Sequence, residues 1–264
     1  MIRCGWPDRA GLPFRLVLVL LPPSETKSIG GRGVPLELDA LSFPDLNPVR
    51  AKLVDAVVEL AADPDTARSV LGLSQRQADE VARNAALRTS PTTPALSRYT
   101  GVLYDALDYA GLTRAGKSKA VARLAVASAL FGVVRGGDPI PAYRLSGGSV
   151  LPAVGPLGAL WRPVLEPALA GVDDFVVDLR SGPYSGLARI PGAVVVKVVT
   201  EDDSGRRQAV SHFNKAHKGF LARALVESRA EPDSVAKLIR VAGGVGMRLE
   251  RTGADAVDLV VSQP

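Results

Sequence analysis

Residues 16–27 read LVLVLLPPSETK, and this segment is the main indicator of the fold class. Its first six residues are apolar without interruption, which is typical of a strand buried on both faces, as in a parallel sheet. The loop that follows, from Pro22 to Lys27, lies at the carboxyl end of that strand. Open α/β sheets bind their ligands at this position. The segment therefore predicts an α/β protein with a ligand site beside the loop.

The hydrophobic pattern of the remaining chain changes repeatedly between helical and strand periods. The spacing predicts helices over residues 48–60, 75–84, 99–110, 117–127, 157–170 (interrupted by two prolines), 214–229 and 233–241. A further helix, after the first of these, is expected to end near residue 70. It predicts strands over residues 129–135, 175–179, 193–199, 208–213, 247–250 and 256–261. Residues 1–15 show neither period and are expected to be an extension, either disordered or the product of an upstream start. We predict a mixed α/β (α+β) fold in a single domain over residues 16–264, with a mixed twisted sheet, flanking helices and a basic cleft.

Composition limits the class of protein. The chain has 264 residues, of which 47% are hydrophobic, enough for one large core. The formal net charge of +5 permits a polyanionic partner without requiring one. The single cysteine, Cys4, excludes an internal disulfide and suits a reducing cytoplasm. The longest apolar run is too short to span a membrane or to serve as a signal peptide, so a cytoplasmic location is expected.

Residues 209–229, AVSHFNKAHKGFLARALVESR, place cations at the start of a predicted helix. Lys215, His217 and Lys218 fall in its first turn, where the backbone already carries partial positive charge. An anion bound among them would explain this arrangement, because free N–H groups and lysines together form a phosphate or carboxylate site. A solvated basic face is the alternative. Gly219 lowers helix propensity and indicates close approach of another group to the backbone.

Two further segments match known motifs. Leu71, Gly72, Leu73 and Ser74 join two predicted helices, as in a helix-hairpin-helix element that contacts DNA phosphates, or as in an ordinary helical hairpin. Residues 111–118, GLTRAGKS, match the phosphate-loop pattern. A helical pattern precedes Gly111 where a phosphate loop needs a strand, so we expect no nucleotide there. The segment is instead interpreted as an ordinary loop before the next helix.

Residues 129–145, ALFGVVRGGDPIPAYRL, combine a predicted strand with a tight turn. Arg135 and Arg144 flank the turn and could converge on one anion, since the planar guanidinium group suits phosphate. Asp138 could equally pair with one of these arginines. Both interpretations remain open from the sequence.

Several of these segments, in this order, resemble the YaaA family of peroxide-stress proteins. The family's Gly-Val-Leu-Arg-Pro-x-Asp and Tyr-Arg-Leu motifs, its Asn-Leu-Ala-Ser-x-Glu-Tyr motif, its Ser-Phe-x-x-Lys-x-x-Arg-Gly motif and its Gly-x-x-Tyr-x-x-Leu motif all have counterparts. The matching residues are Gly132, Val133, Arg135, Asp138, Tyr143, Arg144, Leu145, Asp178, Leu179, Ser181, Tyr184, Ser211, Lys215, Lys218, Gly219, Gly101, Tyr104 and Leu107, with Arg223 in register. The chain departs from the family pattern at several of its positions. Gly136 replaces a proline, Arg180 a small residue, Pro183 an acidic residue and Lys218 an arginine, and the lysine of the family's Ser-Pro-x-Lys loop is displaced or missing.

The resemblance implies a cytoplasmic protein that limits oxidative damage linked to free iron and binds double-stranded DNA, without sequence preference, through a basic cleft. The residues expected to contact DNA or another anion are Arg135, Arg144, Lys215, Lys218, Arg223, Tyr143, Ser181 and Tyr184, assisted by the hairpin. The alternative is an enzyme acting on a phosphorylated or carboxylated small molecule, with the same cations binding the substrate. No catalytic residue or cofactor is assigned, since His212 and His217 lack an obvious carboxylate partner. No metal ligand is assigned either, because these histidines are separated by a predicted strand–helix break and their surroundings are cationic. We expect a monomer.

Overall fold

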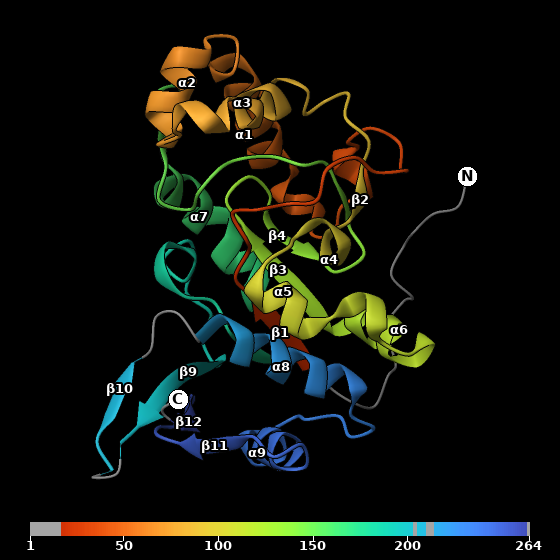
Figure 1. The fold of residues 1–264 in the computed structure, drawn as a ribbon, viewed down its shortest axis with the longest axis vertical. Coiled ribbons are helices and arrows are strands. Elements are labelled where there is room, and N and C mark those ends of the chain that lie inside the picture. The colour runs from red at the N-terminus through yellow and green to blue at the C-terminus, as the bar shows by residue number, and fades with distance from the viewer. Residues whose placement is uncertain (1–16, 203–204, 210–213, 263–264) are drawn as a thin grey trace.

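The computed structural model describes residues 17–202, 205–209 and 214–262, and these form a mixed α/β fold (Figure 1). Its main sheet has the order β11-β12-β9-β8-β1-β3-β4, with β10 paired to β9. The strands are β1 (Val17–Leu21), β3 (Leu124–Ser128), β4 (Gly132–Arg135), β8 (Phe175–Asp178), β9 (Val194–Glu201), β10 (Arg207–Ala209), β11 (Arg248–Arg251) and β12 (Ala256–Ser262). Two short pairs lie outside this sheet: β2 (Thr93–Pro94) with β5 (Pro139–Ile140), and β6 (Val150–Leu151) with β7 (Gly155–Pro156).

The predicted buried strand is confirmed as β1, which occupies the centre of the sheet. All five of its residues are buried, and it pairs in parallel with β3 on one side and β8 on the other. Parallel pairing continues from β8 through β9 to β12, while β4, β10 and β11 are antiparallel to their neighbours. After β1 the sheet continues with β3 on one side, whereas after β8 it continues with β9 on the other side. The crevice between the carboxyl ends of β1 and β8 is therefore a topological switch point, where α/β sheets bind ligands.

The helices form a layer over the sheet and a separate group at one end of the molecule (Figure 1). In Figure 1, α5 and α8 cross in front of β1, and α1, α2 and α3 lie together at the end farthest from β11 and α9. The helices are α1 (Asn47–Leu60), α2 (Pro64–Leu71), α3 (Ala78–Ala85), α4 (Ala95–Arg98), α5 (Val102–Leu107), α6 (Arg114–Arg123), α7 (Leu157–Ala170), α8 (Asn214–Glu227) and α9 (Val235–Gly243). Short 3-10 helices are η1 (Leu38–Ala40), η2 (Pro44–Leu46), η3 (Gln75–Gln77), η4 (Tyr109–Gly111) and η5 (Gly182–Tyr184). No helix in the described part of the chain is long and apolar enough to cross a bilayer.

Arg50 joins the helical group to the sheet. Its side chain is fully buried and donates hydrogen bonds to the carbonyl oxygens of Phe131 at 3.0 Å, Val133 at 2.8 Å and Ser42 at 2.8 Å. It also donates to Asn47 Oδ1 at 2.9 Å. Burial lowers the pKa of Arg50 to about 10, an effect that the nearby carboxylate of Asp138 opposes. One guanidinium group therefore fixes α1 to the turn between β3 and β4.

Two helix predictions need correction. The helix expected over residues 117–127 ends at Arg123, and the next five residues form β3, because they pair with both β1 and β4. The interruption expected within residues 157–170 is absent from α7, which contains Pro163 and Pro167. A buried stripe at four-residue spacing, which includes Trp161, packs α7 against the sheet, and Trp161 Nε1 donates to Ala129 O at 2.8 Å. This packing compensates for the backbone hydrogen bonds that the prolines cannot make.

The close approach that Gly219 indicated is confirmed. A Cβ atom built on Gly219 would lie 2.2 Å from Leu103 O and 2.8 Å from Ala106 Cβ, both in α5. Since real Cβ atoms do not approach other atoms so closely, only glycine allows α8 to pack on α5 at this distance. The contact places the first turn of α8 beside the segments that follow β1 and β8.

Candidate functional site

A pocket of about 470 Å³ lies at the topological switch point. We call it the switch-point pocket, and its lining comes from residues 22–26, 100–104 and 181–184 together with Asn214, Lys215 and Lys218. The first of these segments follows β1 and the third follows β8. The loop after β1 that the sequence marked as a ligand loop therefore forms one wall, and the loop after β8 forms another. This volume suits a small molecule.

Three hydroxyl groups gather where the wall that follows β1 meets the segment before α5. Thr100 Oγ1 donates to Thr26 Oγ1 at 3.2 Å, and the Ser24 and Thr26 hydroxyls are 3.1 Å apart. The backbone N–H of Thr26 donates to Ser24 Oγ at 3.3 Å. Gly101 adopts a φ of 97°, and a Cβ atom there would lie 3.3 Å from Ser24 Oγ. Hydroxyl groups both donate and accept hydrogen bonds, so this wall can bind a polar or anionic ligand.

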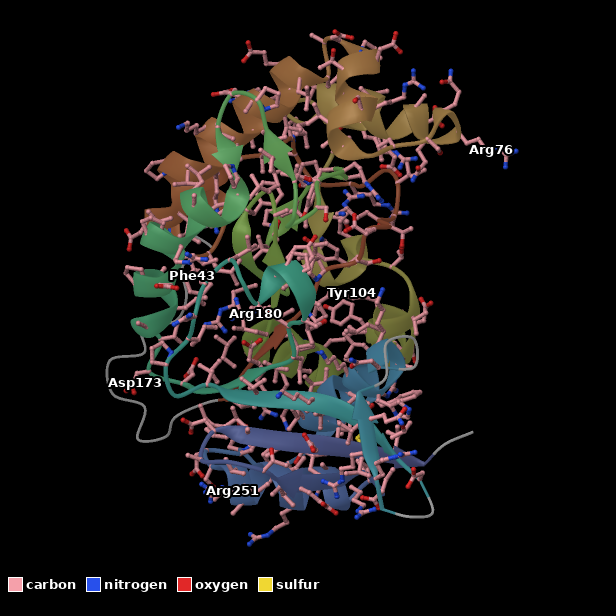
Figure 2. The ribbon with its side chains drawn as sticks, turned by 90° about the vertical axis from the view of Figure 1, so that its left-hand side faces the viewer. Phe43, Arg76, Tyr104, Asp173, Arg180 and Arg251 are labelled. Carbon is pink, nitrogen blue, oxygen red and sulfur yellow. The ribbon has the colours of Figure 1, made fainter. Side chains whose placement is uncertain are left out.

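Tyr104 closes the pocket beneath these hydroxyls. It is buried, and its hydroxyl donates to Pro22 O at 2.9 Å, which ties α5 to the end of β1. Its ring stacks on Tyr99 with 5.4 Å between ring centroids. Burial raises the pKa of Tyr104 well above its ordinary value, so its phenol remains a neutral hydrogen-bond donor. Figure 2 shows Tyr104 in the interior of the molecule, between the helical group and the lower strands.

Arg180 fixes the wall that follows β8. It forms a bidentate ion pair with Asp178, with Nε–Oδ1 and NH2–Oδ2 distances of 2.9 Å. Its guanidinium group also donates to Tyr184 O at 3.2 Å and Ala188 O at 3.0 Å. Asp178 and Arg180 are both buried, and Figure 2 shows Arg180 inside the fold. The loop that carries Ser181 and Tyr184 is thus held in one shape from both of its ends.

Lysines from the opposite wall complete the pocket. Lys215 is exposed at the start of α8, while Lys218, one turn later, is only 3% exposed. Lys218 Nζ donates to Leu179 O at 2.7 Å and lies 3.5 Å from Arg180 O, immediately after β8. Burial lowers the pKa of Lys218 to about 8, although the charge of Asp178 opposes the shift. The first turn of α8 thus brings one exposed and one buried amine to the same pocket.

Lys27 lies behind the wall that follows β1. Its Nζ donates to Ser24 O at 3.0 Å and to Glu25 O at 3.4 Å, and it lies 4.1 Å from the centroid of the Tyr143 ring. Burial lowers the pKa of Lys27 to about 8, with the charge of Glu25 opposing the shift. Lys27 therefore supports the pocket wall through backbone carbonyl groups.

The remaining predicted contact residues do not share one surface. Tyr143 is buried, with its hydroxyl 2.9 Å from Tyr99 Oη and 2.7 Å from Ser128 Oγ. Arg144 lies near the pocket, where its side chain is 3.4 Å from the carboxylate of Glu25.

Arg135 and Arg223 lie away from the switch-point pocket and already have partners. Arg135 is 6% exposed and donates to Ala122 O at 3.1 Å. Arg223 pairs with Asp108 at 2.9 Å and with Glu227 at 3.1 Å. The structure therefore brings Lys215, Lys218, Ser181 and Tyr184 together, but not the full set.

Asp138 does not form the ion pair with Arg135 or Arg144 that the sequence left open. Its carboxylate accepts hydrogen bonds from Ser42 Oγ at 2.7 Å, Ser42 N at 3.0 Å and the backbone N–H of Arg135 at 2.9 Å. It therefore stabilises the turn after β4 through backbone and hydroxyl donors. Burial raises the pKa of Asp138, and these hydrogen bonds oppose that shift.

The predicted hairpin lies in the group formed by α1, α2 and α3. Gly72 ends α2 in the left-handed conformation, with a φ of 63°, and Ser74 precedes η3 and α3. Ser74 N donates to Gln77 Oε1 at 3.0 Å. Leu73 belongs to a small hydrophobic cluster separate from the main core, together with Ala61, Ala67 and Val81. Figure 2 shows Arg76 projecting outward from the end of this hairpin.

The segment that matches the phosphate-loop pattern connects η4 to α6 and does not follow a strand. Asp108 Oδ1 accepts the N–H of Gly111 at 3.1 Å, and Thr113 Oγ1 accepts the N–H of Gly116 at 3.1 Å. These N–H groups would have to face the phosphates of a nucleotide in a working phosphate loop. The geometry is that of a capped helix start.

Metal ligands do not cluster in the part of the chain that the structure describes: no group of three or more His, Cys, Asp or Glu side chains could hold an ion there. His217 lies in the first turn of α8, and burial lowers its pKa. His212, Ser211 and Cys4 fall outside the described residues, as do residues 1–16 and the end of the strand expected over 208–213.

Sequence reasoning missed the hydroxyl group of Thr100 and the structural role of Arg180. A signal for Arg180 was present, since an arginine two residues after a strand-ending aspartate permits a bidentate pair. Thr100 has no comparable signal, because its contact with Thr26 depends on how α5 packs against β1.

Comparisons with known proteins agree with the resemblance found in the sequence. A family model described as "Peroxide stress protein YaaA" matches residues 17–244. A UPF0246 protein of Corynebacterium efficiens is 49% identical over 238 residues, covering 89% of this chain and 95% of the relative. A UPF0246 protein of Streptomyces coelicolor is 45% identical over 240 residues, covering 89% and 92%, and an uncharacterized protein of Campylobacter jejuni is 25% identical over 211 residues, covering 77% and 82%. With most of its length matched in this way, the chain belongs to the YaaA family of peroxide stress proteins.

Proposed function

We propose that this protein limits oxidative damage in the cytoplasm by binding a small phosphorylated or carboxylated molecule in the switch-point pocket. The observation that carries the proposal is the convergence of Lys215, Lys218 and the Ser24–Thr26–Thr100 hydroxyls on one pocket of about 470 Å³. Cationic and hydroxyl groups that converge in a concave site are typical of an anion-binding pocket. Any effect on free iron is then indirect.

The shape of the site favours a small ligand over a nucleic-acid duplex. Of the five cations expected to contact DNA, Lys218 and Arg135 are buried. Arg144 and Arg223 are paired with carboxylates, which leaves Lys215 exposed at the pocket. A duplex needs several exposed cations along its backbone. A small anion needs only one or two, and the pocket provides them.

The proposal is tested by thermal-shift and calorimetric titration with phosphorylated and carboxylated metabolites. A ligand that binds only the folded state stabilises it by about 2.7 kcal/mol at 100 times its Kd, so binding raises the melting temperature. Lys215→Ala should raise the Kd by at least about tenfold, and the rise in melting temperature should shrink accordingly. Lys197→Ala removes an exposed lysine of β9, outside the pocket, and should leave binding unchanged. Retained affinity in Lys215→Ala, or the absence of any anionic ligand, would contradict the proposal.

Double-stranded DNA remains a second candidate, and the geometry of the hairpin supports it. Gly72 and Ser74 are exposed between two short helices, and Arg76 projects from the same end (Figure 2). Such an element contacts the DNA backbone without reading its sequence. Anisotropy titration at several salt concentrations should give a log–log slope of about −0.9 for each phosphate neutralised. Arg76→Ala should weaken binding and reduce the slope, whereas a slope near zero would exclude this mode.

A further inference from the structure

Lys218 is a buried amine with an unusual set of partners. It lines the switch-point pocket and is 3% exposed, and its Nζ donates to Leu179 O at 2.7 Å and lies 3.5 Å from Arg180 O. Asp178 directly precedes Leu179, but its carboxylate already forms the bidentate ion pair with Arg180. Within the described residues, no carboxylate oxygen lies within 4.0 Å of Lys218 Nζ. Among the residues that the structure describes, the protonated form of this lysine therefore has no direct counter-ion.

The surroundings of Lys218 make its amine easier to deprotonate than that of an ordinary lysine. Burial lowers its pKa to about 8, and Asp178 at the end of β8 is the charge that opposes the shift. The other titratable groups that face the pocket are Lys215 on the same helix, Glu25 after β1, Tyr104 in α5 and Tyr184 after β8. A lysine of lowered pKa can act as a nucleophile near neutral pH, whereas an arginine in the same place would stay protonated.

We propose that Lys218 is a nucleophilic amine that forms an imine with the carbonyl carbon of a small anionic aldehyde or ketone, while Lys215 binds the anionic group of that compound. The inference rests on the proposed small-anion function of the switch-point pocket and specifies its substrate class. The nitrogen of Lys218 bonds to the carbonyl carbon, the carbonyl oxygen leaves as water, and the amine loses both of its protons to that water. No oxidant or reductant takes part.

The placement of the two lysines fits this division of roles. Residues three apart lie on the same face of a helix, with roughly 5–6 Å between their Cβ atoms. An aldehyde with an adjacent carboxylate, or with a phosphate a few bonds away, can therefore reach both amines from within the pocket. The Ser24 hydroxyl lines the same pocket and can donate a hydrogen bond to the carbonyl oxygen as it leaves. Burial of Lys218 also limits competing reactions with bulk water.

The test is reductive trapping of the imine. The full-length protein is incubated with glyoxylate or, separately, with the neutral aldehyde propanal, each with sodium cyanoborohydride, and the modified lysines are identified by peptide mass spectrometry. We expect glyoxylate to label Lys218 roughly tenfold or more faster than exposed Lys197, because a lower pKa increases the neutral fraction by tenfold per unit. The labelling rate at Lys218 should rise with a midpoint near pH 8. A rate no greater than that of Lys197, a midpoint near pH 10, or labelling of Lys27 instead would overturn the proposal.

Two variants separate this inference from the anion site itself. In Lys215→Ala, glyoxylate labelling of Lys218 should fall while propanal labelling stays the same. Lys218→Arg should abolish the adduct, and its melting temperature shows whether the variant folds. If the variant does not fold, the labelling of Lys218 and Lys197 in the wild-type protein still tests the proposal. If Lys218 reacts equally with both aldehydes and Lys215→Ala has no effect, Lys218 is a nucleophile but the proposed anion binding by Lys215 is wrong. If glyoxylate stabilises the protein without forming an adduct, the pocket binds anions but the proposed imine formation at Lys218 is wrong.

Discussion

Replacing Gly219 with alanine tests the contact that positions the first turn of α8. In an open helix interior this substitution would stabilise the protein by up to about 1 kcal/mol, because alanine has the higher helix propensity. Here the new Cβ would lie 2.2 Å from Leu103 O and 2.8 Å from Ala106 Cβ. Optimal contacts are about 3.5–4.0 Å, so α5 and α8 must separate by roughly 1 Å. Both obstacles belong to the backbone or its first side-chain atom, and neither can rotate away.

Forced separation of packed elements costs about 1–3 kcal/mol, and more where nothing can yield. After the gain in helix propensity, we expect Gly219→Ala to destabilise the fold by about 1–2 kcal/mol. For a chain of this size each kcal/mol lowers the melting temperature by about 2–4 °C. Because Lys218 adjoins this contact, ligand binding in the switch-point pocket should weaken as well.

The assay is thermal and urea unfolding of the variant beside the wild type. Gly243→Ala is the matched control, because Gly243 is also helical but a Cβ atom there would meet nothing within 4 Å. The control should leave stability unchanged or raise it. A Gly219→Ala protein as stable as the wild type would refute the reasoning, since it would mean that α8 can move away from α5 at no cost.

Three further outcomes follow from buried charges. Arg180→Ala should destabilise the fold by about 3–5 kcal/mol in urea unfolding, because it leaves the buried carboxylate of Asp178 without its partner. Arg50→Lys should not preserve stability: a lysine cannot reach four separate acceptors, and a loss of about 3 kcal/mol in the same assay is expected. The folded-state pKa of Lys218, about 8, is below its unfolded value, so the unfolded state binds more protons above pH 8 and stability rises from pH 8 toward pH 10.5, by about 3 kcal/mol at most. Unfolding titrations at pH 7.5, 8.5 and 9.5 should record this rise, and Lys218→Met should reduce it.

The sequence was most informative where the residues themselves determine the structure. The central strand followed from its unbroken apolar run, and the position of the pocket followed from the loop after it. Gly219 was correctly associated with a close contact, because glycine in a helix needs such a reason. These features depend on local composition or on general rules of α/β topology.

Prediction failed where distant partners decide the outcome. Residues 124–128 continue a helical pattern, and only their pairing with β1 and β4 makes them a strand. The position of Lys218 suggested a phosphate contact on an exposed face, but the carbonyl groups of Leu179 and Arg180 hold it inside the protein. Burial of Arg135 likewise depends on packing against α6. No pattern within those segments carries this information.

The central position of β1 also affects how the protein can fold during synthesis. Its two sheet neighbours begin at Leu124 and Phe175, so residues 22–123 must emerge from the ribosome before the first pairing and most of the following segment before the second. Contacts between such distant segments form slowly, because a long loop must close before any pairing compensates for it. Meanwhile the apolar strand Val17–Leu21 has no partner on the nascent chain. An unpaired apolar strand of this kind is a target for chaperones and a starting point for aggregation.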